Sequence, residues 1–126
     1  MILDTNAVSA AVLTGDQTIG EALAGAERHH LPLVVIGEYQ FGLLASRRRR
    51  RLETLFRRLE ADSIVLYADR ETADWYAAIR LDLKKNGTPI PENDIWVAAL
   101  ARQYSLEFVS RDAHFDAVDK IKRRSW

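Results

Sequence analysis

Short apolar segments of strand length alternate along this chain with longer segments that have the spacing of amphipathic helices. Strands buried on both faces and separated by helices are typical of βαβ units and of a parallel sheet. We expect strands at residues 1–3, 33–36, 64–66 and 108–109, with a last edge strand opening at Ile121. We expect helices at residues 19–30, 38–45, 71–85 and 94–104, and a further helix that carries the apolar stripe Leu52, Leu55, Phe56 and Leu59.

This alternation predicts an α/β protein, a three-layer α/β/α sandwich around a central parallel sheet. The sequence has no linker, repeat or low-complexity segment, so we expect a single domain over residues 1–126. Hydrophobic residues make up 48% of the chain, which is enough to bury a core. No apolar run reaches the ~20 residues of a membrane span and no secretory leader precedes the first strand. We therefore expect a cytoplasmic protein with no membrane partner.

The chain contains no cysteine, which excludes disulfide scaffolds, Cys-based zinc sites, iron–sulfur clusters and thiol nucleophiles. His29, His30 and His114 are too few for a histidine-rich zinc site, so any metal would rest on oxygen ligands. We expect His29 and His30 to close a helix at its negative end. We expect His114 to pack against or cap the loop in which it lies, with contact to a phosphate as the alternative.

Four acidic residues stand where a parallel sheet would gather them. Asp4 ends the first strand, and Glu38 and Asp112 follow later strands within two or three residues. Asp94 stands at the start of a helix, immediately after a turn. Right-handed crossovers place all strand C-termini on one edge, and open parallel sheets bind ligands at that edge. We therefore expect these four carboxylates to converge.

Each acid taken singly has a structural explanation, because Glu38 and Asp94 suit the first turn of a helix and Asp112 can cap a short one. The set is harder to explain, since two carboxylates about 5 Å apart repel by about 3 kcal/mol at an effective dielectric of 20. Protons or cations must neutralise such a cluster. Oxygen ligands without Cys or His select Mg²⁺ or Mn²⁺, which lower the pKa of a bound water and stabilise charge on a phosphoryl group.

Four blocks of this sequence are Ile2-Leu3-Asp4-Thr5-Asn6, Glu38 opening a helix, Asn93-Asp94-Ile95-Trp96-Val97-Ala98-Ala99 and Ser110-Arg111-Asp112-Ala113-His114-Phe115. In order and in spacing they resemble the PIN-domain ribonucleases, and within them the VapC-type toxins of toxin–antitoxin pairs. The resemblance covers nearly the whole chain. It implies a PIN-like sandwich and a Mg²⁺- or Mn²⁺-dependent endoribonuclease acting on RNA.

The same resemblance assigns roles to particular residues. It implies that Asp4, Glu38, Asp94 and Asp112 form the catalytic and metal-binding pocket. It also implies that Thr5, Asn6 and Ser110 support these acids and position water. The sequence departs from the family at Ser110-Arg111-Asp112, where many members have Thr-Asn-Asp, so Arg111 adds a cation near the site. Asp116 is a further acid that we expect to point away.

Other proteins also gather acids at parallel-strand ends. A receiver-type phosphoacceptor needs paired acids after its first strand and a lysine after its last core strand, and Asp4 and Arg111 fit neither requirement. A haloacid-dehalogenase-type phosphatase needs Asp-x-Asp, where this chain has Asp4-Thr5-Asn6. Two alternatives within the PIN fold remain open: a nuclease of RNA processing with no toxin role, and a catalytically inactive module that binds RNA or protein.

The resemblance also implies a protein partner, a small antitoxin whose C-terminal segment lies across the helices beside the site. Apolar residues lie on more than one face of the helix opened by Glu38, and only one face can point to the sheet; these residues are Tyr39, Phe41, Leu43 and Leu44. The remaining face and the stripe from Leu52 to Leu59 must be covered by a partner segment or a second copy. We expect both, a homodimer and an inhibitor segment.

The net charge is zero, with 18 basic and 18 acidic residues, but the basic residues are clustered. Seven lie between Arg47 and Arg58 and four between Lys120 and Arg124. The five consecutive arginines from Arg47 to Arg51 repel one another on a helix, with few acids four residues away, and RNA phosphates would compensate this repulsion. We expect RNA contacts at Arg47, Arg49, Arg50, Lys120, Lys122 and Arg123. A solvated basic face and contact with the antitoxin are the alternatives.

Overall fold

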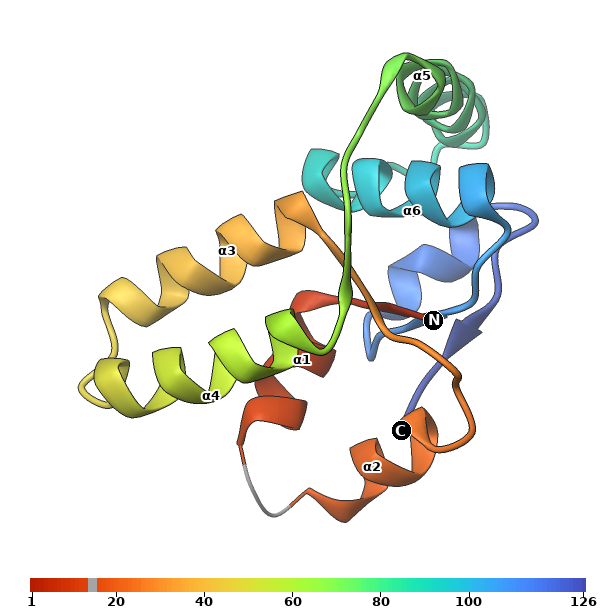
Figure 1. Ribbon diagram of the computed structural model, residues 1–126. Helices are drawn as coiled ribbons and strands as arrows, with labels where there is room; N and C mark the ends of the chain where they lie inside the picture. The colour runs from red at the N-terminus through yellow and green to blue at the C-terminus, as the bar shows by residue number, and fades with distance from the viewer. Residues whose placement is uncertain (14–15) are drawn as a thin grey trace.

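The computed structural model describes residues 1–13 and 16–126, and a five-stranded parallel sheet lies at its centre (Figure 1). The strands follow the spatial order β3-β2-β1-β4-β5. They are β1 (Ile2–Leu3), β2 (His30–Pro32), β3 (Ile64–Leu66), β4 (Phe108–Val109) and β5 (Arg123–Arg124). Because every pair is parallel, all the strands end at the same edge of the sheet, with β1 in the middle.

In the part of the chain that the structure describes, six α-helices and one 3₁₀-helix connect the strands. They are α1 (Thr5–Val12), α2 (Gln17–Leu23), α3 (Leu33–Leu44), α4 (Arg49–Ala61), α5 (Arg70–Lys85), α6 (Glu92–Tyr104) and the 3₁₀-helix η1 (Ala113–Ala117). Helices α1 to α4 contact one another on one side of the sheet, and α5 packs on α6 on the other (Figure 1). The expected three-layer α/β/α sandwich is confirmed. None of the helices in the described ranges has the length and apolar composition to cross a membrane.

The core lies on both faces of the short strands. Phe108 of β4 packs edge-on against Phe115 of η1, with ring centroids 4.7 Å apart. Tyr39 of α3 packs against Phe56 of α4, also at 4.7 Å. Helix α6 is buried from Val97 through Ala101, because its alanines allow close packing between the sheet and α5. These contacts fix the helices that carry polar residues to the edge where the strands end.

The strand predicted at residues 33–36 is wrong. These residues form the first turn of α3, and the strand is β2, three residues earlier. A short β-branched run cannot be assigned to a strand or a buried helix from periodicity alone, and Val35 and Ile36 are buried on a helix. Glu38 consequently lies in the second turn of α3 and does not open the helix.

The helix predicted at residues 19–30 is also wrong in extent. Helix α2 ends at Leu23, and Gly25 has a positive φ of 84°, a conformation that stops a helix. His29 and His30 therefore close no helix, and His30 begins β2. Helix α1, for which no element was expected, starts directly after Asp4. The edge strand begins at Arg123, two residues after Ile121.

The remaining elements agree with expectation to within two residues. Helix α4 carries the predicted stripe, but α1 and α3 of the same chain cover it: Phe56 is buried and Leu52, Leu55 and Leu59 pack partly buried against the core. The expectation that this stripe needs an outside partner is thus incorrect. The helix starts at Arg49, so Arg47 and Arg48 belong to the turn before it and the arginine run does not wrap a helix.

Candidate functional site

The four acids predicted from the sequence come from four elements at the edge where the strands end. Asp4 follows β1 and caps α1, and Asp112 follows β4. Glu38 projects from the second turn of α3, and Asp94 is the third residue of α6. Asp4 is almost fully buried, with 3% of its surface exposed, and the Asp94 side chain is 14% exposed. The topology thus brings together residues 108 positions apart in the chain.

Hydrogen bonds from neutral side chains hold these carboxylates. Asp4 accepts from the Thr5 backbone N–H at 2.8 Å and from the Ser110 hydroxyl at 2.7 Å. The Asn6 amide donates to Asp112 at 3.0 Å and to Asp4 at 3.4 Å. The Thr5 hydroxyl donates to Glu38. The three polar residues expected beside the acids therefore all contact them.

Burial and mutual repulsion among the acids dominate the electrostatics of the site, with His114 opposing them at Asp94. Burial raises the pKa of Asp4, and the nearby Asp112 and Glu38 carboxylates raise it further against the hydrogen bonds that it accepts. Burial, followed by the charge of Asp4, raises the pKa of Asp94 to about 6. Groups with perturbed pKa values in a cluster of like charges are typical of catalytic and metal-binding sites.

His114 contacts one of the four acids, which the sequence did not predict. The His114 Nε2 lies 2.8 Å from Oδ2 of Asp94, a contact that differs from the expected packing or capping and from the alternative of a phosphate contact. The short helix η1 turns His114 back toward α6, and its ring also packs on Phe115. A histidine two residues after a candidate ligand on a tight turn was the available signal. Asp116, as expected, points elsewhere and pairs with Arg123.

The donor set suits a hard divalent cation. It consists of carboxylate oxygens with neutral hydroxyl and amide partners, and none of the hydrogen bonds and ion pairs described for the four acids comes from a lysine or arginine side chain. Among the described residues, however, no three acidic or histidine side chains already surround one point closely enough to hold a metal. The carboxylates would therefore have to move toward a bound ion.

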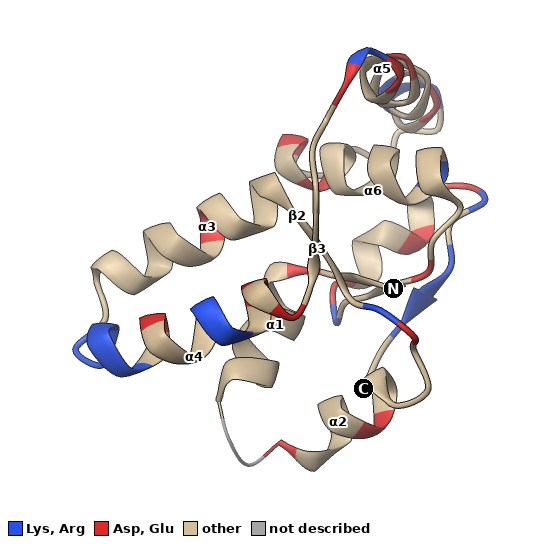
Figure 2. Cartoon of the chain, viewed as in Figure 1, with Lys and Arg blue, Asp and Glu red and all other residues tan. Residues whose placement is uncertain are grey.

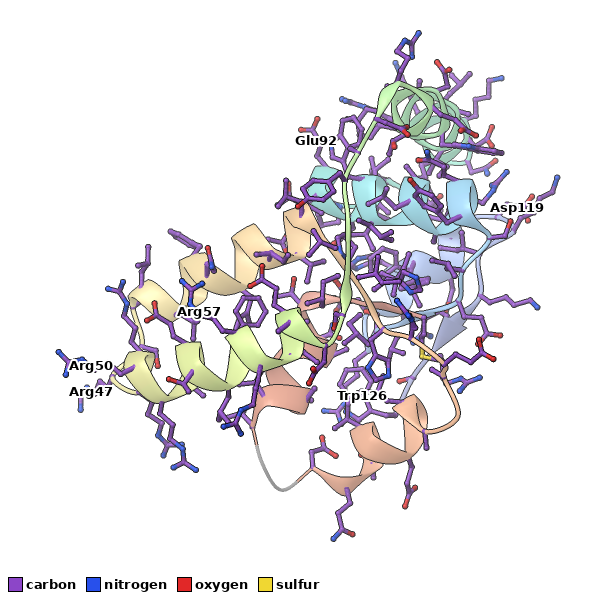
Figure 3. All side chains as sticks on the ribbon, in the orientation of Figure 1. Arg47, Arg50, Arg57, Glu92, Asp119 and Trp126 are labelled. Atoms are coloured by element: carbon purple, nitrogen blue, oxygen red, sulfur yellow. The ribbon has the colours of Figure 1, made fainter. Side chains whose placement is uncertain are left out.

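The two clusters of basic residues, at residues 47–58 and 120–124, differ in the contacts that their side chains make. The Arg47–Arg51 run lies at the tip of the hairpin formed by α3 and α4, away from the sheet (Figures 2 and 3). Within it Arg49 pairs with Glu53 at 3.1 Å. In the cluster at residues 120–124, Lys120 and Lys122 are exposed. Arg123 binds Asp116 through two hydrogen bonds of 2.8 and 2.7 Å, and its side chain is 17% exposed.

One face of α3 is apolar and open. Tyr39 and Leu43 are buried, whereas Phe41 is 78% exposed and Leu44 is also exposed. The expectation that only some of these four residues face the sheet is therefore confirmed. Gly42 lies on the same helix, and a Cβ built there would meet no atom within 4 Å. This open face runs beside Glu38.

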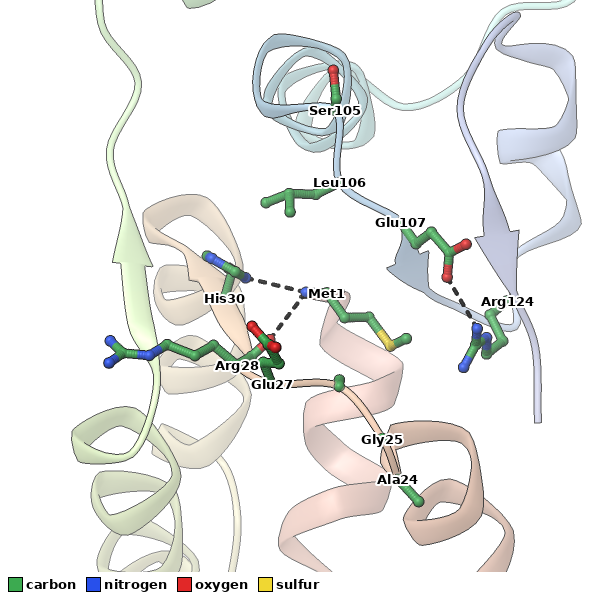
Figure 4. A pocket seen from close by; sticks show the side chains of 11 residues that line it. Met1, Ala24, Gly25, Glu27, Arg28, His30, Ser105, Leu106, Glu107 and Arg124 are labelled. Atoms are coloured by element: carbon green, nitrogen blue, oxygen red, sulfur yellow. Dashed lines mark hydrogen bonds and ion pairs between the residues drawn. The ribbon is translucent and has the colours of Figure 1, made fainter.

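A separate polar hollow of about 680 Å³ lies at the opposite edge of the sheet (Figure 4). It is lined by residues at or just before the start of strands, including Met1 and His30, and by the Glu107–Arg124 ion pair. The Met1 ammonium donates to the Arg28 carbonyl at 3.0 Å. None of the four acids lines this hollow, so it belongs to a different part of the molecule.

Comparison with known proteins supports this description. The family model described as the PIN domain matches residues 1–121. Ribonuclease VapC5 of Mycobacterium tuberculosis is 34% identical over 122 residues, which cover 94% of this chain and 87% of that protein. Toxin FitB of Neisseria gonorrhoeae is 30% identical over 77% of this chain and 75% of its own length. The crystal structure of VapBC-5 from M. tuberculosis superposes with a TM-score of 0.80 at 26% identity, covering 99% of this chain and 97% of that one.

Proposed function

The chain belongs to the PIN-domain family, and from this premise we propose that it is a metal-dependent endoribonuclease that acts as the toxin of a toxin–antitoxin pair. The observation that carries the proposal is the convergence of four carboxylates from β1, α3, α6 and β4 without a lysine or arginine partner among their described contacts. Relatives named as a ribonuclease and as a toxin support the two halves of the proposal.

Asp4, Glu38, Asp94 and Asp112 would hold Mg²⁺ or Mn²⁺. A bound divalent cation supplies a water of lowered pKa and positive charge beside the phosphoryl oxygens. The chain's own groups hold the ligands in place: Ser110 and the Thr5 N–H orient Asp4, Thr5 orients Glu38, and Asn6 joins Asp4 to Asp112. His114 orients the Asp94 carboxylate through its Nε2.

The RNA strand would cross the acidic edge and reach basic residues on either side. We assign phosphate contacts to Arg47, Arg49 and Arg50 at the hairpin tip and to Lys120 and Lys122 at the other end. Arg123 contributes less, because its guanidinium is already committed to Asp116. Such contacts carry affinity and salt dependence without sequence information.

The antitoxin would cover the open face of α3. Phe41 and Leu44 present apolar area there, and a segment seated on them reaches Glu38 one turn away. A homodimer would cover other exposed apolar residues, such as Leu33 and Tyr67. The antitoxin partnership fits the matched structure of VapBC-5, a member of the VapBC family of toxin–antitoxin systems.

The test is RNA cleavage by the purified chain with Mg²⁺ or Mn²⁺, with Asp4→Asn and Asp94→Asn as variants. We expect wild type to cleave within the strand and both variants to fall at least ~100-fold in rate, the scale on which a misplaced catalytic group acts, while their circular dichroism stays native. Cleavage that persists in Asp4→Asn would exclude this site. A wild type that binds RNA without cleaving would indicate the inactive module instead.

A second experiment distinguishes the toxin from an RNA-processing nuclease. Expression of the intact chain should arrest growth, and Asp94→Asn should be harmless at equal protein level. Co-expression of the protein encoded next to this chain should relieve the arrest. Harmless expression of a protein that cleaves RNA in vitro would favour the processing role.

A further inference from the structure

Arg111 lies next to Trp126 where two neighbouring strands end. Strand β4 pairs with β5 in parallel, with Val109 opposite Arg124. Two residues further along, this register places Arg111 beside Trp126. The guanidinium carbon of Arg111 lies 4.4 Å from the centroid of the Trp126 ring. Arg111 follows directly after Ser110 and precedes Asp112, so the pair flanks the acidic site.

Arg111 contacts three residues: Trp126, Asp16 and Asn6. Its Nη2 lies 3.5 Å from Oδ2 of Asp16, and the indole N–H of Trp126 donates to the same oxygen at 3.2 Å. The Arg111 backbone N–H donates to the side-chain oxygen of Asn6 at 3.3 Å, and the Asn6 amide in turn donates to Asp112. Hydrogen bonds, chiefly from the Thr18 hydroxyl, keep the pKa of Asp16 below its usual value, so this carboxylate is ionised. The backbone and the guanidinium of Arg111 are thus both held in place.

Arg111 and Arg123 both lie at the loop that follows β4, and their guanidinium groups make different contacts. Arg123 donates to the Ser110 carbonyl at 3.0 Å and makes two further hydrogen bonds to the Asp116 carboxylate. Among the described residues, the Arg111 guanidinium makes one long hydrogen bond, of 3.5 Å to Asp16, and its side chain is 52% exposed. A guanidinium carries five N–H donors in a planar fork. Arg123 therefore has a structural part, whereas the half-exposed guanidinium of Arg111 uses one of its donors within the described chain.

We propose that Arg111 binds a phosphate of the RNA strand next to the one at the acidic site, and that Trp126 and Asp16 position its guanidinium for this contact. The inference rests on the proposed nuclease function. A polyanion approaching four carboxylates is repelled, so a cation fixed on the same loop favours one path for the strand. Stacking on the indole reduces the rotamer entropy that the side chain would give up on binding.

RNA phosphate fits this group better than a protein carboxylate does. Single-stranded RNA carries a phosphate at every nucleotide, so a strand with one phosphate at the acids necessarily brings another one nearby. Arg111 is joined to that site through Asn6 and through the chain itself. A protein partner, in contrast, would have to place a carboxylate beside the acidic cluster, where like charges repel it.

The experiment measures the binding of a fluorescein-labelled single-stranded RNA of mixed sequence by fluorescence anisotropy. The RNA is about 12 nucleotides long, which is within the usual site size of single-strand binding proteins. The measurements are made in EDTA, which prevents cleavage, over a range of salt concentrations. Arg111→Gln should weaken binding about tenfold at low salt, as removal of one charged hydrogen bond does. The slope of log affinity against log salt should become shallower by about 0.7, the value for one phosphate bound on a single strand. A merely structural role would leave this slope unchanged.

Three further variants complete the test. Arg111→Lys should keep the slope and give up part of the affinity, because a lysine retains the charge without the fork or the stacking. Trp126→Leu should likewise keep the slope and weaken binding. Arg102→Gln is the matched control, because Arg102 also stacks on an indole, that of Trp75 at 4.9 Å, but on the far end of α6. It should leave the slope unaltered, and melting curves check that each variant is folded.

An unchanged slope in Arg111→Gln overturns the proposal, and so does an equal change in Arg102→Gln, which would indicate a general effect of charge. Loss of binding to the antitoxin with an unaltered RNA slope also overturns it and assigns Arg111 to the protein partner. These outcomes differ from failure of the proposed function, which would appear as absence of cleavage by wild type with Mg²⁺ or Mn²⁺.

Discussion

At the scale of single residues, the site is organised by small neutral side chains placed between carboxylates. The Ser110 hydroxyl donates to the Asp4 carboxylate and accepts from the Asp112 backbone N–H at 3.0 Å. The Asn6 amide donates to both Asp4 and Asp112. Hydrogen bonds of this kind fix the direction of a ligand without neutralising it. The repulsion among the acids therefore remains for a cation to relieve.

The raised pKa of Asp94 predicts how the stability of the metal-free protein depends on pH. The folded state raises this pKa from the ordinary 3.8 to about 6, so folding favours the protonated acid. That contribution is fully present below about pH 4 and disappears as the pH rises through about 6. In EDTA, Asp94→Asn should therefore melt at a higher temperature than wild type at about pH 7.5, and this difference should shrink toward zero at about pH 4.5. A difference independent of pH would contradict the shifted pKa.

At the scale of elements, α3 combines a buried face, an open apolar face and one acid of the site. Its N-terminal half packs on α6 and α1 and carries Glu38 to the site, while its C-terminal half leads into the α3–α4 hairpin with the arginine run (Figure 2). A glycine inside a helix costs about 0.5–1 kcal/mol relative to alanine. Gly42 has no neighbour that would exclude a Cβ, so nothing in the described chain explains it.

Substitutions on α3 separate stability from partner binding. Gly42→Ala should stabilise the chain by about 0.5–1 kcal/mol in urea unfolding, because it removes backbone freedom without a clash. Phe41→Ser should change stability by less than about 0.5 kcal/mol and weaken antitoxin binding. Leu43→Ser, a buried neighbour on the same helix, should cost about 2–5 kcal/mol. Antitoxin affinity unaffected by Phe41→Ser would place the partner elsewhere.

The hairpin tip makes a second prediction at this scale. Replacing Arg47, Arg49 and Arg50 by Ser should make the salt dependence of RNA binding shallower by up to about 2, at roughly 0.7 for each phosphate that is no longer bound. Arg49 contributes least, since Glu53 already holds it. Arg57→Ser with Arg58→Ser is the control, because both side chains are exposed further along α4. Equal slopes for the two sets of variants would argue against a specific RNA path at the tip.

At the scale of the whole molecule, folding and metal binding are coupled through the acids. The sheet holds four like charges at one edge, and a ligand that binds only the folded state stabilises it by mass action. Free Mn²⁺ at about 100 times its Kd should add about 2.7 kcal/mol, which raises the melting temperature by several degrees. The increase should be smaller in Asp94→Asn and Asp112→Asn. Equal increases in all three proteins would indicate non-specific binding to the surface.

From the sequence alone it was possible to predict the fold class and the gathering of four acids at one edge of the sheet. Both follow from the order of elements along the chain: strands alternating with helices give a parallel sheet, and residues at parallel-strand ends meet at one edge. Asp4, Asp94 and Asp112 were predictable because each directly follows a strand or opens a helix. Glu38 converged with them although its strand was misplaced, because the end of β2 and the first turns of α3 lie at that same edge.

Contacts that depend on the direction of a side chain could be seen only once the chain was folded. A β-branched run such as Leu33–Ile36 suits a buried helix as well as a strand, and packing against α1 and α6 selects the helix. The contact of His114 with Asp94 spans 20 residues, and the contact of Trp126 with Asp16 spans 110. Such pairs form because separate elements meet at an angle and register that no local pattern encodes, so composition and spacing could not reveal them.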